Sequence, residues 1–192
     1  MNPTNFEADR LIVRPFVTDD LQTIHRILDQ TLGDGTKATN EPALHERKSW
    51  LEWSILSQEW LPKMDQTPYG DRAIALKSND QVIGSVGYVP LLDVYWQIPE
   101  LGIASRGYAT PEVGLFWVID PQHQKQGYAT KAAQVLIDHA FKHWRLARIL
   151  ATTDYSNVAS QAVMRKLGMK LMRNALPEPH WLQVVGVLEN TS

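Results

Sequence analysis

The chain contains no cysteine, and this absence excludes three kinds of chemistry at once. Disulfides, thiolate metal sites and a cysteine nucleophile all require that residue, and we expect no metal site. No apolar run approaches the ~18 residues that a membrane-spanning helix needs, and we recognise no signal peptide. We therefore expect a cytoplasmic protein with no membrane partner.

The chain also lacks an excess of charge of either sign. Its formal net charge is -2 and its sequence pI is about 6.3, so it has no basic footprint for nucleic acid. Its 192 residues are 44% hydrophobic and 21% charged, which is typical of a globular domain. The length predicts a single domain over residues 1–192, with a possible loop insertion over residues 91–110. Monomer and homodimer both remain open.

Hydrophobic spacing predicts strands and helices in alternation, without the strict rhythm of a parallel βαβ protein. The expected strands cover residues 11–13, 72–77, 81–89, 112–119, 147–154 and 182–188. The expected helices start near Asp19, run from Pro42 to Trp60, run from Ala129 to Trp144, and lie between a cap at Ser156 or Asn157 and Gly168. Residues 33–36 are expected to form a flexible loop. The pattern predicts an α/β (α+β mixed) fold with a mixed sheet and helices on both faces.

Two common phosphate-binding motifs are missing, and a third kind of loop is present. The chain has neither G-x-x-x-x-G-K-[S/T] nor G-x-G-x-x-G. It has Gln124-Lys125-Gln126-Gly127-Tyr128-Ala129 between an expected strand and an expected helix. Amides at a helix start have no internal partner, the helix dipole adds partial positive charge, and a glycine admits a ligand close to the backbone. This loop therefore indicates binding of a phosphorylated cofactor.

Four segments carry a resemblance to a known family. The Q-x-x-G-x-A pattern of the loop resembles the acyl-CoA pyrophosphate loop of the GNAT acetyltransferase superfamily. Residues 147–154, followed by Asn157-Val158-Ala159-Ser160 and by residues 164–169, resemble its second signature. Residues 9–16 resemble the R-L-x-L-R-P opening of the branch that includes the ribosomal-protein alanine N-acetyltransferases, and residues 82–87 resemble that branch's mid-chain strand.

The resemblance implies a GNAT-like fold and acetyl-CoA as co-substrate. The implied sheet is mostly antiparallel and splays open between the strand that ends near Ile119 and the strand that starts near Arg148, where acyl-CoA enters. The implied pyrophosphate anchor is Gln124, Lys125, Gln126, Gly127, Tyr128, Ala129 and Thr130. Main-chain groups of Trp117, Val118 and Ile119 are expected to pair with the pantetheine arm, and Asn157 with a pantetheine amide.

The implied activity is an N-acetyltransferase that moves an acetyl group from acetyl-CoA to a primary amine. The amine belongs to a protein N-terminus or to a small molecule, and the absence of cysteine favours direct transfer. Glu112 is the expected general base, with a purely structural role at the strand start left open, and His123 is a weaker candidate. Many members place a tyrosine where this chain has Met164, so Ser160 is expected to meet the departing sulfur, ahead of Tyr155 and Tyr128. The alternative is a GNAT-fold module that binds CoA for regulation, without turnover.

Aromatic residues suggest a place for the acceptor. Trp50, Trp53 and Trp60 on the second expected helix, with Tyr95 and Trp96 in the long loop, are candidates for an acceptor pocket. Aromatic residues at helical spacing are more often core residues, and that reading stays open as well.

Overall fold

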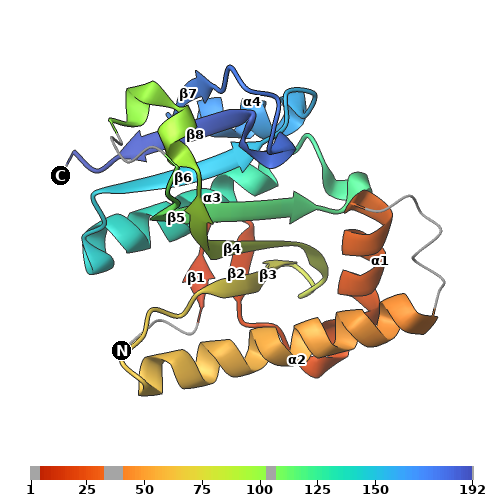
Figure 1. The fold of residues 1–192 in the computed structure, drawn as a ribbon. Helices are drawn as coiled ribbons and strands as arrows, with labels where there is room; N and C mark the ends of the chain where they lie inside the picture. Colours follow the sequence, from red (N-terminus) through yellow and green to blue (C-terminus); the bar gives the residue numbers. More distant parts are fainter. Residues whose placement is uncertain (1–4, 33–40, 103–106, 192) are drawn as a thin grey trace. The chain divides into compact units, whose positions relative to one another are not determined.

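The computed structural model describes residues 5–32, 41–102 and 107–191. The loop expected over residues 33–36 lies outside these ranges. The strands are β1 (Phe6–Glu7), β2 (Leu11–Arg14), β3 (Gly70–Leu76), β4 (Val82–Asp93), β5 (Thr110–Ile119), β6 (Arg148–Thr153), β7 (Lys170–Arg173) and β8 (Val184–Glu189). The α-helices are α1 (Leu21–Leu32), α2 (Glu41–Lys63), α3 (Tyr128–His139) and α4 (Val158–Lys166) (Figure 1). The mixed α/β fold with a mostly antiparallel sheet is thus confirmed.

The chain divides into two compact units. The first comprises residues 1–88 and 116–136, and the second comprises residues 89–115 and 137–192. Strands β4 and β5 run through both units, so each unit contains one half of either strand. The single domain expected over residues 1–192 stays a prediction.

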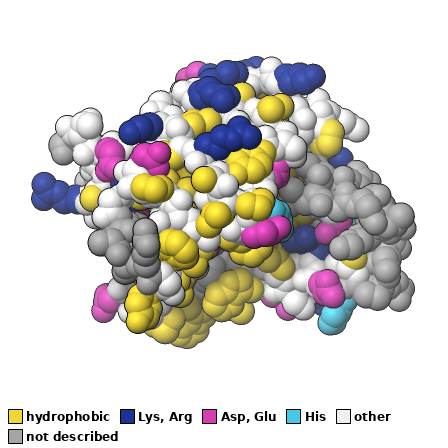
Figure 2. All heavy atoms as spheres, turned by 45° about the horizontal axis from the view of Figure 1, so that its top comes forward, with side chains coloured by type: hydrophobic (Ala, Val, Ile, Leu, Met, Phe, Trp, Pro, Cys, Tyr) yellow, Lys and Arg dark blue, Asp and Glu magenta, His cyan; other side chains and the backbone are white. Residues whose placement is uncertain are grey.

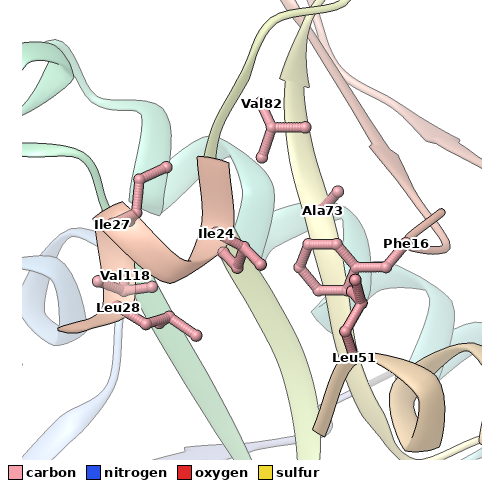
Figure 3. Packing of buried hydrophobic residues seen from close by; sticks show 8 residues of the cluster. All are labelled: Phe16, Ile24, Ile27, Leu28, Leu51, Ala73, Val82 and Val118. Carbon is pink, nitrogen blue, oxygen red and sulfur yellow. The ribbon is translucent and has the colours of Figure 1, made fainter. Parts of the chain in front are cut away.

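The sheet of the first unit follows the order β1-β2-β3-β4 and ends on the second half of β5. Helices α1 and α2 cover one face, because their apolar residues meet those of the strands in one cluster (Figure 3). The cluster consists of Phe16, Ile24, Ile27, Leu28, Leu51, Ala73, Val82 and Val118. On the other face the hydroxyl of Tyr88 donates a hydrogen bond to the carbonyl of Leu136 in α3 (2.6 Å). Helices therefore cover both faces of this unit, as the sequence predicted.

In the second unit the order is β5-β6-β8-β7. The parallel pair β5–β6 meets at Gly114 and Leu150, whereas β8 is antiparallel to both β6 and β7. Helix α4 lies on the face of Gly186, where an added Cβ would come within 3.0 Å of the Met164 sulfur. Residues 94–102 pack on the opposite face, which carries Val185 and Val187.

Some boundaries differ from the sequence expectations. The helix expected from Ala129 to Trp144 is α-helical to His139 and continues as a π-helical turn over Ala140–Trp144. The strands β1 and β7 were not expected, since they are two and four residues long and too short to show a period. Residues 91–110 are not one loop, because the first three extend β4 and two 3₁₀ turns follow at Tyr95–Gln97 and Pro99–Leu101.

Candidate active site

The loop between β5 and α3 has an unusual backbone. A 3₁₀ turn over Pro121–His123 follows β5 and is capped by Asp120, whose carboxylate accepts from the amide of Gln122 (3.1 Å). The side chain of Gln124 donates to the carbonyl of Ile119 (3.0 Å) and so holds the loop to the strand end. Lys125 (φ 61°) and Gly127 (φ 80°) both adopt left-handed conformations. Turns of this kind aim successive amides toward one point, which suits an anion.

The amides of this loop have room for a ligand. Lys131 is the residue whose amide closes the first turn of α3, onto the carbonyl of Gly127 (3.1 Å). Within the described residues, no acceptor pairs with the amides of residues 125–130. A Cβ placed on Gly127 would meet no atom within 4 Å. The predicted anchor residues are therefore brought together around an open helix start, which fits a pyrophosphate group.

Two residues before β2 brace this loop, a contact between distant segments that sequence reasoning missed. The guanidinium of Arg10 donates to the carbonyl of Gln126 (3.1 Å) and lies 4.7 Å from the centre of the Tyr128 ring. Asp9 forms an ion pair with Lys131, and the hydrogen bond from Lys131 lowers the pKa of the Asp9 carboxyl. Lys131, in the first turn of α3, is thus already paired. Lys125 is exposed.

The end of β5 is also tied into the first unit. The amide of Asp120 donates to the carbonyl of Ile83 in β4 (2.8 Å), and the Asp120 side chain pairs with Arg26 of α1. Burial acts to raise the pKa of Asp120, but the hydrogen bonds from Arg26 and from the Gln122 amide outweigh it and hold the pKa below its usual value. This anchorage positions Trp117, Val118 and Ile119 directly before the loop. Their pairing with pantetheine stays a prediction.

Glu112, the expected base, has a partner of its own in the second unit. Its carboxylate accepts two hydrogen bonds from Arg148 of β6, one at 3.1 Å to Nε and one to Nη2. Both side chains are largely shielded, at 11% exposed for Glu112 and 24% for Arg148. The hydrogen bond to Glu112 raises the pKa of Arg148. Glu112 would have to release this guanidinium, at least in part, to accept a proton from an amine.

The second signature forms a helix start that its own side chains already satisfy. The Asp154 carboxylate accepts from the amides of Ser156 (2.8 Å) and Asn157 (2.9 Å). The bonds from the Ser156 hydroxyl and these amides hold the pKa of Asp154 below its usual value. Asn157 caps α4, because its Oδ1 accepts from the amide of Ser160 (3.0 Å). Only the Nδ2 group of Asn157 remains for a pantetheine amide, and Ser160 lies half-buried in the first turn.

Met164 and Tyr155 are both engaged in contacts within the second unit. Met164 is fully buried beside Gly186, so the position that holds a tyrosine in many family members is a core position here. The Tyr155 hydroxyl donates to the carbonyl of Asn174, and the guanidinium of Arg173 lies 4.2 Å from the centre of its ring. The Tyr155 hydroxyl is thus already engaged, and the role of Ser160 at the sulfur stays a prediction.

The candidate acceptor aromatics do not share one environment. Trp50 packs against Phe16, with ring centres 5.5 Å apart, and Tyr95 is fully buried in the core of the second unit. Trp53 and Trp60 are 63% and 51% exposed. Trp96 is half-buried. Trp50 and Tyr95 are thus packing residues, and the pocket stays a prediction for the others.

A family model for the acetyltransferase (GNAT) domain matches residues 10–170. The chain belongs to the GNAT acetyltransferase family. This confirms the family predicted from the four sequence segments, and acetyltransferases of this family use acetyl-CoA.

Two Bacillus subtilis (strain 168) relatives of this GNAT protein carry the name uncharacterized N-acetyltransferase. YnaD is 44% identical over 64 residues, which are 33% of this chain and 36% of YnaD. YjdG is 30% identical over 111 residues, which are 58% of this chain and 57% of YjdG. The chain thus matches between about a third and a little over half of the length of these relatives.

Solved structures share the GNAT fold at low sequence identity. The ribosomal-protein-S5-alanine acetyltransferase from Vibrio fischeri has a TM-score of 0.65 at 18% identity, covering 98% of this chain and 97% of that one. The microcin C7 self immunity acetyltransferase MccE, solved in complex with acetyl-CoA and AMP, has a TM-score of 0.65 at 12% identity, covering 97% and 95%. At these identities the likeness concerns the fold.

Two further properties bear on partners. Among the described residues, no helix is long and apolar enough to cross a membrane. The same residues contain no group of three or more His, Cys, Asp or Glu side chains placed to hold a metal ion. Figure 2 shows Lys and Arg side chains interspersed with acidic and hydrophobic ones on the face that it draws.

Proposed function

We propose that this GNAT protein is an N-acetyltransferase that transfers an acetyl group directly from acetyl-CoA to a primary amine. One observation carries the proposal. The amides of residues 125–130 surround an open helix start in which Gly127 leaves space for a ligand. Each interaction of an anion with a helix start contributes only ~0.3–1 kcal/mol, so several amides acting on one pyrophosphate are needed for useful affinity.

The contacts described above support the remaining proposed roles. Trp117, Val118 and Ile119 offer main-chain groups to the pantetheine arm, and Asn157 offers its Nδ2 group to a pantetheine amide. Ser160 donates a hydrogen bond to the sulfur as it departs. Glu112 is a candidate for the base, in competition with its own bond to Arg148. The acceptor is a protein N-terminus or a small molecule.

Acetyl-CoA itself provides the first test. A ligand that binds only the folded state at a hundredfold excess over its dissociation constant stabilises that state by about 2.7 kcal/mol. We therefore expect the melting temperature to rise with acetyl-CoA at millimolar concentration. A flat melting temperature would count against the loop as a CoA site.

Turnover separates the enzyme from a CoA-binding regulatory module. The measurement is release of free CoA from acetyl-CoA in the presence of a panel of primary amines that includes peptides with free N-termini, polyamines and amino sugars. An enzyme releases CoA in step with acetylation of one class of amine. A regulatory module binds acetyl-CoA but releases no CoA with any member of the panel.

A variant of Ser160 tests the chemistry at sulfur. Replacing Ser160 with alanine removes the hydroxyl but leaves the amide that Asn157 caps. A hydrogen bond to developing charge contributes ~1.5–3 kcal/mol, so turnover should fall about 10- to 100-fold while the affinity for acetyl-CoA is retained. Unchanged turnover would transfer the role to Tyr155, Tyr128 or water.

A further inference from the structure

Asp71, near the start of β3, is a carboxylate that the sequence did not single out. It pairs in register with Gly87 of β4. Side chains two residues apart on a strand point to the same face, so Asp71 points to the face of Ala73, which belongs to the cluster under α1 and α2. Asp71 is half-buried. It therefore lies on the helix-covered face of the first unit.

The carboxylate of Asp71 leans over Gly87. A Cβ added to Gly87 would lie 2.6 Å from Asp71 Oδ1, so the missing side chain of Gly87 makes room for the carboxylate. Among the described residues no group donates a hydrogen bond to Asp71. Its oxygens keep contact with the surface, because neither belongs to the fully buried polar atoms that lack a partner. An accessible carboxylate without a donor is suited to meet an ammonium group.

The negative charge of Asp71 is only weakly compensated by the charged groups around it. Burial raises its pKa to about 6, and the field of Arg47 in α2 acts in the opposite direction. Arg47 itself donates to Asp29 of α1 (2.9 Å), which also pairs with His25. The neighbouring Arg72 of β3 donates to Gln58 of α2 (2.5 Å). The Asp71 carboxyl is thus expected to hold its proton more tightly than an ordinary aspartate.

Asp71 lies in the same unit as the β5 residues that are expected to pair with pantetheine. The amide of Asp120 bonds to Ile83, and a Cβ on Gly84 would touch Val118 and Ile119, so β4 and β5 run antiparallel here. Gly87, further along β4, therefore lies beside β5 residues that precede Val118. Neighbouring strands are about 5 Å apart, so a carboxylate above Gly87 is about one strand spacing from β5.

We propose that Asp71 receives the ammonium group of the acceptor and removes its proton before acetyl transfer. This rests on the proposed function. One proton passes from the ammonium nitrogen to a carboxylate oxygen of Asp71 and then to solvent. The nitrogen lone pair forms the N–C bond to the thioester carbonyl and the C–S bond breaks. The second proton leaves the nitrogen and ends on the sulfur of CoA, so atoms and charges balance.

Replacing Asp71 with asparagine tests this role. D71N keeps the size of the side chain but cannot accept the proton. We expect kcat/KM for an amine that the wild type acetylates to fall about 100-fold or more, as for a lost general base, with the affinity for acetyl-CoA unchanged. D19N is the matched control, because Asp19 is an exposed carboxylate of the same unit, and it should match the wild type.

The pH dependence gives a readout that a structural role would not change. In the wild type, kcat/KM should fall as pH drops through about 6, where Asp71 takes up a proton. This limb should be absent in D71N. The pKa itself is measurable from the ¹³C carboxyl resonance of Asp71, found by its absence in D71N. If D71N keeps the wild-type rate and pH profile, the Asp71 proposal is overturned and the acetyltransferase proposal stands. If the wild type acetylates no amine, both proposals fail.

Discussion

The two compact units differ in whether their candidate ligand-binding groups already have protein partners. In the first unit, neither the amides of residues 125–130 nor the carboxylate of Asp71 has a hydrogen-bond partner among the described residues. In the second unit, Glu112 is bonded to Arg148 and Asn157 caps α4. Groups without partners are costly to bury unless a ligand meets them. Their removal should therefore affect binding or turnover and relieve a cost in stability, whereas removal of paired groups should lower stability.

The largest expected effect concerns the open loop. Gly127→Val places a β-branched side chain at a positive φ and in the space that the amides surround. We expect the affinity for acetyl-CoA to fall about 100-fold or more, which corresponds to ~2.7 kcal/mol. Calorimetric titration with acetyl-CoA measures it.

Gly107→Val is the control for backbone strain. Gly107 also has a positive φ (82°) and open surroundings, so its replacement carries a similar backbone cost. Its affinity for acetyl-CoA should match the wild type. Equal affinities for G127V and the wild type would show that the loop does not bind the pyrophosphate, and the contrast between the units would lose its main support.

The second prediction is a gain in the free energy of unfolding, whereas most mutations lower it. The folded-state pKa of Asp71 is raised from 3.8 to about 6, so its contribution to stability is present below pH ~4 and is lost as pH rises through 6. At 1.36 kcal/mol per pKa unit, the loss is on the order of 2–3 kcal/mol. D71N should therefore be more stable than the wild type at pH 8, with a difference that shrinks toward pH 5. Urea unfolding at several pH values decides it, and a less stable D71N at pH 8 would contradict the assignment.

The residues that sequence reasoning found form a local motif. Those that it missed depend on contacts between segments far apart in the chain. The loop from Gln124 to Ala129 is local, so the chain order alone revealed it. The bracing by Asp9 and Arg10, and the position of Asp71 over Gly87, depend on which distant segments come together. Trp50 and Trp53 lie on the same helix but at different positions around its axis, so Trp50 packs on Phe16 whereas Trp53 is exposed. The burial of Met164 depends on Gly186, on a strand that follows it in the chain.

In the second unit, replacement of the paired carboxylate of Glu112 should lower the free energy of unfolding. Glu112→Gln retains one acceptor oxygen but removes the charge that faces Arg148. A hydrogen bond between charged groups contributes ~1.5–3 kcal/mol, and we expect a loss toward the lower end of that range in urea unfolding. A double-mutant cycle with Arg148→Gln isolates the pair. If E112Q instead leaves stability unchanged and lowers the rate more than D71N does, Glu112 is the base and Asp71 is not.

The smallest expected effect concerns the helix cap. Asn157→Ala removes the Oδ1 that accepts from the Ser160 amide, and loss of such a cap costs ~1 kcal/mol. Asn157→Asp separates capping from ligand binding, because aspartate keeps an acceptor for the Ser160 amide but lacks the Nδ2 donor proposed for pantetheine. N157D should therefore retain the stability that N157A loses, as measured by urea unfolding. A weaker affinity of both variants for acetyl-CoA would support the pantetheine contact. If only the stability of N157A changes, Asn157 has a structural role alone. The paired groups of the second unit would then act in stability even at this position, in contrast to the open groups of the first unit, which act in binding or turnover.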